Sequence, residues 1–99
     1  MALTEQQKKC LRGLGHGLKP VLTISANGLS DAVLRELDAT IAHHELIKVK
    51  VRAQDRHVRD RIVDDLCRES SAELVTRIGN VALIFRRNAS QPRIVLPAA

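Results

Sequence analysis

The sequence predicts a mixed α/β (α+β) fold in which three helices pack on a four-stranded mixed sheet, in the order αβαβαββ. Two segments, 31–44 and 55–69, carry apolar residues at helical spacing, and a short β-branched segment precedes each of them. Gly79-Asn80 separates two further apolar segments, which is typical of a β-hairpin. Strands that alternate with helices pair in parallel through right-handed crossovers, whereas a hairpin adds an antiparallel pair.

The 99 residues provide one hydrophobic core, and we assign a single domain to residues 1–97. No apolar run approaches the roughly 18 residues of a membrane helix, and the N-terminus lacks the apolar stretch of a signal peptide. Cys10 and Cys67 are isolated, which favours two free thiols rather than a disulfide. Free thiols in turn are typical of a reducing compartment. We therefore expect a cytoplasmic monomer without metal, cofactor or membrane contact.

The first helix is predicted to begin at a capping box formed by Thr4 and Gln7 and to end near Leu14, where three glycines follow. Its expected core side consists of Cys10, Leu11 and Leu14. Three basic residues point away from that side: Lys8, Lys9 and Arg12. They are either an ordinary solvated surface or part of a binding surface.

A first strand is predicted from Pro20 to Ile24, because proline at the first residue of a strand needs no ladder donor. The loop Ser25-Ala26-Asn27-Gly28 follows, and Ser30 is placed to cap the helix over 31–44. Backbone amides and the positive end of the helix dipole then converge on one point, which indicates a phosphate site. An ordinary strand–turn–helix joint is the alternative.

The helix over 31–44 should face the core with four residues at i, i+3 and i+4 spacing: Val33, Leu34, Leu37 and Ile41. His43 and His44 fall in its last turn, where the helix dipole favours positive charge. Adjacent histidines point in different directions around a helix, so a shared metal ion is not expected.

Residues 46–52 alternate strictly, with Ile47, Val49 and Val51 on one side. The other side is cationic: Lys48, Lys50 and Arg52. This row can bind a polyanion, or it can guard a sheet edge against pairing with another chain.

The third helix, 55–69, should bury Val58, Ile62, Val63 and Leu66. Its arginines form two expected i, i+4 ion pairs, Arg61–Asp65 and Asp64–Arg68, so we exclude this helix from the binding surface. Strands are predicted over 73–78 and 81–87. The final segment, 88–99, is either an ordered extension or a frayed tail.

The net charge of +5 is concentrated outside the second and third helices. Residues 1–30 carry a net charge of +3, residues 45–52 carry +2, and residues 77–99 carry +4 without an acidic residue. This segregation favours a surface that binds a polyanion. Phe85 is the only aromatic residue, so an RNA contact must use phosphates, amides and 2′-hydroxyls rather than stacking on exposed rings.

With these elements in place, the chain resembles a CRM (chloroplast RNA splicing and ribosome maturation) domain in its free-standing, bacterial YhbY-like form, over residues 2–97. The resemblance rests on these motifs: Leu-x-Gly-Leu-x-His at 11–16, Leu-Lys-Pro-Val at 18–21, Asn-Gly-Leu-Ser at 27–30, His-His-Glu-Leu-Ile-Lys-Val-Lys at 43–50, Ile-Gly-Asn at 78–80 and Ile-Val-Leu-Pro at 94–97. Family members carry a GxxG loop, similar to the phosphate-clamping loop of KH domains. Here Ser25 replaces the first glycine, and Ala26-Asn27 lacks the lysine that many members have.

The resemblance implies a fold similar to the C-terminal domain of translation initiation factor three, and a non-enzymatic RNA-binding protein associated with large ribosomal subunit precursors. Its RNA-binding residues would be the loop and the flanking lysines and arginine: Ser25, Ala26, Asn27, Gly28, Lys8, Lys9, Arg12, Lys19, Lys48 and Lys50. An enzyme is disfavoured, because no nucleophile or phosphate-loop motif has the required spacing. A protein-interaction module whose basic surface binds acidic partners is the alternative.

Overall fold

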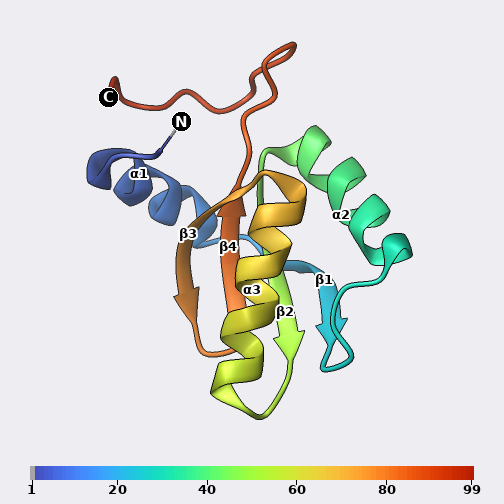
Figure 1. Cartoon of the computed structure of the whole chain (residues 1–99). Coiled ribbons are helices and arrows are strands. Elements are labelled where there is room, and N and C mark those ends of the chain that lie inside the picture. The colour runs from blue at the N-terminus through green and yellow to red at the C-terminus, as the bar shows by residue number, and fades with distance from the viewer. Residues whose placement is uncertain (1) are drawn as a thin grey trace.

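The computed structural model describes residues 2–99 and contains three helices and four strands in the predicted order (Figure 1). The elements are α1 (Glu5–Gly15), β1 (Pro20–Ser25), α2 (Asp31–His44), β2 (Leu46–Arg52), α3 (Arg56–Ser70), β3 (Glu73–Ile78) and β4 (Val81–Phe85). The last strand ends at Phe85, two residues earlier than predicted. Among the described residues, no helix combines the length and apolarity that crossing a membrane requires.

The four strands form one mixed sheet in the order β1-β2-β4-β3. β1 and β2 are parallel, because α2 carries the chain back between them, and β4 runs antiparallel to both β2 and β3. Gly79, with φ of +60°, supplies the left-handed residue in the hairpin turn between β3 and β4. The predicted fold class is therefore confirmed.

The main core lies between the sheet and the pair formed by α2 and α3, which cover the same face (Figure 1). Its buried residues come from both helices and from alternate strand positions: Leu22, Ile24, Leu37, Ile41, Ile47, Val49, Val51, Ile62, Val63, Leu66, Ala82 and Ile84. The predicted helix stripes and the alternation of β2 account for most of this set. The other side of β2 consequently faces away from these helices.

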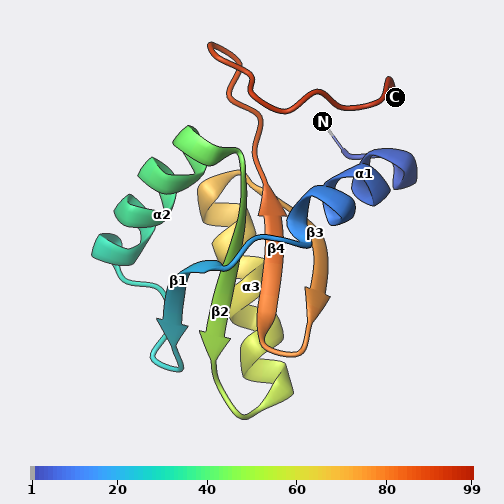
Figure 2. The same ribbon diagram turned by 180° about the vertical axis from the view of Figure 1, so that it is seen from behind.

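The opposite face of the sheet is covered only at one end, by α1 and the C-terminal segment (Figure 2). A second core lies there, made of Leu11, Leu46, Val75, Leu83 and Phe85. The predicted place of Leu14 in the core was wrong, because its side chain is 51% exposed. α1 instead buries Gln7, Leu11 and Gly15, which follow one another at i, i+4 spacing. A Cβ at Gly15 would lie 2.7 Å from a methyl of Leu83, so α1 approaches the sheet closely at this glycine.

The C-terminal segment is an ordered extension, held by the side chain of Glu45. This residue caps α2 with φ of +65° and is completely buried. Its carboxylate accepts hydrogen bonds from the amides of Asn88 at 2.8 Å, Arg93 at 2.7 Å and Ile94 at 2.9 Å. Burial alone would raise the pKa of Glu45, but these three hydrogen bonds and the charge of Arg87 lower it below its ordinary value.

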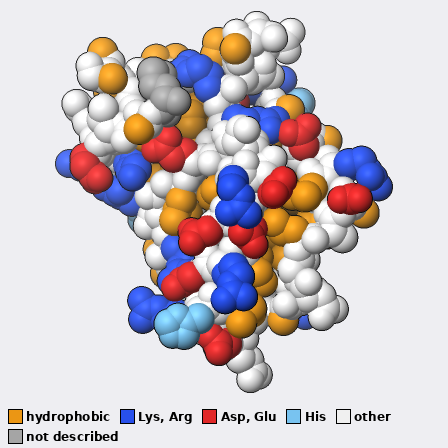
Figure 3. Space-filling view, viewed as in Figure 1, with side chains coloured by type: hydrophobic (Ala, Val, Ile, Leu, Met, Phe, Trp, Pro, Cys, Tyr) orange, Lys and Arg blue, Asp and Glu red, His pale blue; other side chains and the backbone are white. Residues whose placement is uncertain are grey.

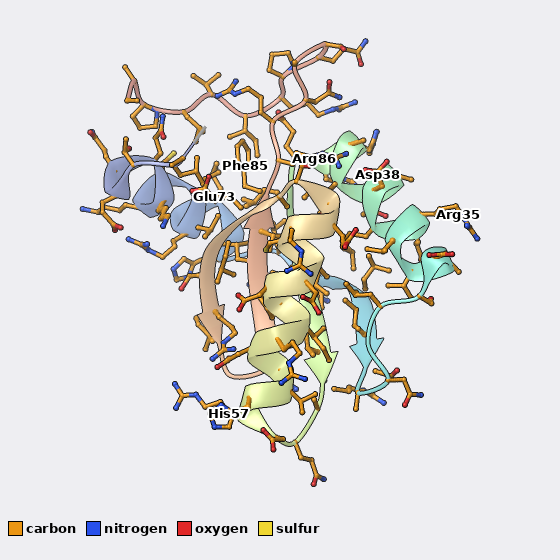
Figure 4. All side chains as sticks on the ribbon, viewed as in Figure 1. Arg35, Asp38, His57, Glu73, Phe85 and Arg86 are labelled. Carbon is orange, nitrogen blue, oxygen red and sulfur yellow. The ribbon has the colours of Figure 1, made fainter. Side chains whose placement is uncertain are left out.

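Arg86 follows β4 directly, and its side chain connects α2 to α3 (Figure 4). Its Nη1 donates to Oδ1 of Asp38 on α2 at 2.6 Å and to the carbonyl oxygen of Ser70 on α3 at 2.9 Å. On the same face, Arg77 of β3 pairs with Asp60 of α3. Two of the four arginines in residues 77–99 are thus neutralised here, and they add no free charge to the opposite face.

Candidate nucleic-acid interface

The loop after β1 is a hydrogen-bonded turn with an open backbone. The amide of Gly28 donates to the carbonyl oxygen of Ser25 at 3.0 Å, and Gly28 has φ of +90°. Ser25 does not adopt positive φ, so serine at this position causes no left-handed strain. The amides of Ala26 and Asn27 donate to no other atom within the described residues, and a Cβ at Gly28 would meet nothing within 4 Å. Two donors are therefore available to a ligand that approaches closely.

The predicted helix cap beside this loop is present. The Oγ of Ser30 accepts a hydrogen bond from the amide of Val33 at 3.2 Å, and Asp31 occupies the first turn of α2. The negative charge of Asp31 partly offsets the positive end of the helix dipole. The loop amides, rather than the helix terminus itself, are thus the stronger anion donors here.

A groove of about 520 Å³ separates the loop from α3. It contains two arginines and three acids, namely Arg61, Arg68, Asp31, Asp65 and Glu69. Positive and negative side chains alternate along α3 (Figure 3). The groove is therefore slightly acidic, and it does not favour a phosphate.

The two predicted i, i+4 pairs on α3 were wrong. Nη2 of Arg68 instead pairs with Oδ1 of Asp65 at 2.7 Å, an i, i+3 contact. Arg61 forms no ion pair among the described residues and lines the groove that faces the loop. Self-neutralisation therefore does not exclude Arg61 from the binding surface.

The cationic residues of β2 alternate with residues of the main core, so they lie on the open face of the sheet, opposite to α2 and α3. Figure 2 shows the sheet from that side. Lys48 is in register with Pro20, Lys50 with Thr23, and Arg52 with Ser25, the first residue of the loop. The row therefore runs toward the loop and ends beside it. Arg52 was absent from the predicted site residues, although the alternation of β2 had already placed it on this side.

The interpretation of this row as an edge guard was wrong, because β2 pairs with β1 on one side and with β4 on the other. A strand that is paired on both sides presents no free edge to another chain. The half-buried side chains of Lys48 and Lys50 therefore have no protective role at a sheet edge, which strengthens the ligand-binding interpretation.

α1, which carries Lys8, Lys9 and Arg12, lies at the opposite end of the sheet from the loop after β1 (Figure 2). Arg12 lines a cavity together with Lys48, which links α1 to the row on β2. Lys8 is half-buried on α1, whereas Lys9 and Lys19 are exposed. The predicted site residues thus form a strip across the sheet rather than one compact cluster. We name the strip formed by Arg12, Lys48, Lys50 and Arg52 the basic strip.

The described residues contain no metal-binding cluster. No set of three or more His, Cys, Asp or Glu side chains lies close enough there to hold a metal ion. Burial raises the pKa of Cys67 to about 11, and the charges of Asp64 and Glu73 contribute to this rise, so the thiol stays protonated near neutral pH. The thiolate, which is the reactive form of a cysteine, is therefore disfavoured at Cys67.

Comparison with known proteins agrees with this architecture. A protein of Pseudomonas aeruginosa, named as a probable RNA-binding protein, is 48% identical over 88 residues, covering 89% of this chain and 85% of the relative. An RNA-binding protein of Haemophilus influenzae is 40% identical over 95 residues, covering 96% and 95% of the two chains. The solution structure of a hypothetical protein from Staphylococcus aureus superposes with a TM-score of 0.83 at 31% identity, covering 97% of this chain and 100% of the other.

The characteristic pattern of the CRS1 / YhbY (CRM) domain matches residues 3–86, which include the loop, the basic strip and all seven elements up to Phe85. The resemblance drawn from the motifs is therefore confirmed: this chain belongs to the CRS1 / YhbY (CRM) domain family.

Proposed function

We propose that this chain is a non-enzymatic RNA-binding protein that holds the phosphate backbone of RNA along the basic strip and at the loop. The observation that carries the proposal is the placement of Lys48, Lys50 and Arg52 in one row on the open face of the sheet, ending at Ser25. Three cations at alternate positions of one strand are evenly spaced on one face, so they can neutralise successive charges of a polyanion. The names of the relatives support RNA as that polyanion.

The loop adds directional contacts to this electrostatic attraction. Arg52 is in register with Ser25, so a phosphate bound beside Arg52 has one guanidinium as partner and lies next to a loop in which the amides of Ala26 and Asn27 are free. A phosphate that approaches from the side of α3 meets the acidic groove instead. The RNA therefore passes on the side of the open sheet face.

We further propose that the RNA belongs to large ribosomal subunit precursors and that binding takes place in the cytoplasm. This finer assignment rests on the resemblance to CRM domains, chiefly the motif at 43–50. It is tested by sedimenting cell extracts on gradients, where the protein should migrate with particles that precede the mature large subunit. Migration only at the top of the gradient, away from every ribosomal particle, would argue against it.

RNA binding itself is tested with the purified protein and large-subunit ribosomal RNA that carries no ribosomal protein. We expect saturable binding whose affinity falls steeply as salt rises, because phosphate neutralisation dominates. Nucleoside triphosphates and RNA should remain uncleaved in the same mixtures. Failure to bind this RNA, together with binding to an acidic protein, would instead identify a protein-interaction module.

A further inference from the structure

A cavity of about 360 Å³ opens between the C-terminal end of α1 and the open face of the sheet. Its floor is apolar and consists of Val81 and Leu83, with Ile78 at the edge. Its rim carries Arg12, His16 and Lys48, and no acidic side chain among the described residues lines it. The volume lies within the range of roughly 300–1,000 Å³ that small-molecule sites occupy.

The chemistry of this cavity fits a ligand with an apolar body and a negatively charged group. An apolar floor binds the body by excluding water, and two permanent cations at the rim attract the charge. Ile78 is 78% exposed, so an isoleucine side chain is left in water beside the cavity. A ligand that covers Ile78 would gain by burying it.

The position of the cavity indicates which anion this is. Lys48 both lines the cavity and begins the row of cations that leads along β2 to the loop. An RNA strand whose phosphates follow that row passes directly beside the cavity. Phe85 is buried in the second core, so a base in this cavity would contact the aliphatic floor, with His16 and Arg12 at the rim.

We propose that this cavity holds one unpaired nucleobase of the bound RNA, with a phosphate of the same nucleotide between Arg12 and Lys48. This inference rests on the proposed RNA-binding function and deepens it. The protein would then require a single-stranded or bulged nucleotide at one point of its RNA site, rather than a continuous duplex.

The test is a titration of the isotopically labelled 99-residue chain with nucleoside 5′-monophosphates, followed by methyl NMR. The nucleotides should produce saturable shifts of the Val81, Leu83 and Ile78 methyl signals. Ribose 5-phosphate and inorganic phosphate should leave those methyl signals in place, because they lack the base. Equal shifts with ribose 5-phosphate, shifts only with an acidic amphipathic peptide, or no shift with any nucleotide would each overturn the proposal.

A cavity-filling variant provides the second arm. Thr76 lines the cavity, and Thr76→Leu takes up space there without changing any charge. It should weaken nucleotide binding by about tenfold, while Thr40→Leu on α2, outside the cavity, should leave it unchanged. Unchanged nucleotide affinity in a folded Thr76→Leu protein would overturn the proposal.

The two proposals fail in different ways. If the wild-type protein binds ribosomal RNA with a steep salt dependence but nucleotides do not reach the cavity, the base site is wrong and RNA binding stands. If it does not bind RNA at all, the proposed function fails whatever the methyl signals show.

Discussion

The buried carboxylate of Glu45 accepts a hydrogen bond from the amide of Ile94 at 2.9 Å, across 49 residues of sequence. The same side chain accepts hydrogen bonds from the amides of Asn88 and Arg93, so one residue at the end of α2 fixes the C-terminal segment at three points. Ile94 and Leu96 are thereby packed against the second core, and Gln7 of α1 donates to the carbonyl oxygen of Pro97 at 2.9 Å. Glu45, within the family-like motif at 43–50, therefore has a structural role.

Glu45→Gln should lower the free energy of unfolding by about 2–3 kcal/mol, because it removes charge-assisted hydrogen bonds and turns an amide NH₂ toward backbone donors. Thermal or urea unfolding measures this, and Glu36→Gln at an exposed position of α2 is the matched control. Equal stability of the two variants would show that the C-terminal segment is held by its apolar residues alone.

The contribution of Glu45 should also depend on pH. Its pKa is lowered in the folded state, so the folded protein favours the charged carboxylate. The stabilisation is therefore complete above the ordinary pKa of 4.5 and is lost as the pH falls through the lower folded value. The difference in stability between wild type and Glu45→Gln should thus shrink on acidification below about pH 4.5, and a difference that grows there would contradict this assignment.

Ile41→Asp should unfold the protein, since Ile41 is completely buried between α2 and the sheet. An unpaired carboxylate at this position costs several kcal/mol, which is a large part of the stability of a small domain. Circular dichroism melting is the measurement, and Ala39→Asp on the exposed side of α2 should melt close to wild type. Equal melting of the two variants would place the wrong side of α2 in the core.

Gly28→Asp should reduce RNA affinity by about tenfold or more and leave the fold in place. The new Cβ meets no atom within 4 Å, but the carboxylate would face the bound phosphate with like charge. The control is Gly28→Asn, which has nearly the same shape as Gly28→Asp and the same backbone strain at φ of +90° but carries no charge. If both variants bind as wild type does, the loop is only a turn.

Arg52→Ala should flatten the dependence of log K on log salt by about 0.7 units for single-stranded RNA, because one phosphate fewer is neutralised in the complex. Arg35 is the matched control, because it is exposed on α2 and points away from the open sheet face (Figure 4). Arg35→Ala should retain the wild-type slope. Similar slopes for the two variants would remove Arg52 from the binding surface.

Charge reversal distinguishes the two sides from which a phosphate can reach the loop. Arg52→Glu adds a negative charge beside Ser25 on the open face, whereas Arg61→Glu adds one in the groove next to α3. We expect the first to weaken RNA binding at least about tenfold more than the second at low salt. The reverse order would place the RNA over α3.

Sequence periodicity and turn signals predicted every element and the mixed sheet. The strict alternation over 46–52 fixed the bounds of β2, and the capping residues Thr4 and Ser30 are where local chemistry required them. These features depend on neighbours within about four residues, and such interactions are encoded locally. The same local pattern identified the cations of β2 and the turn that ends at Gly28.

Only the tertiary structure decided how these parts face one another. Strand order placed β2 in the middle of the sheet, which removed its role as an edge and brought Arg52 beside Ser25. The crossing of α1 over the sheet buried Gln7 and exposed Leu14, and it formed the cavity at Lys48. These relationships join residues far apart in the sequence, so they depend on packing energies summed over the whole core. The hydrophobic periodicity of a single segment therefore cannot predict them.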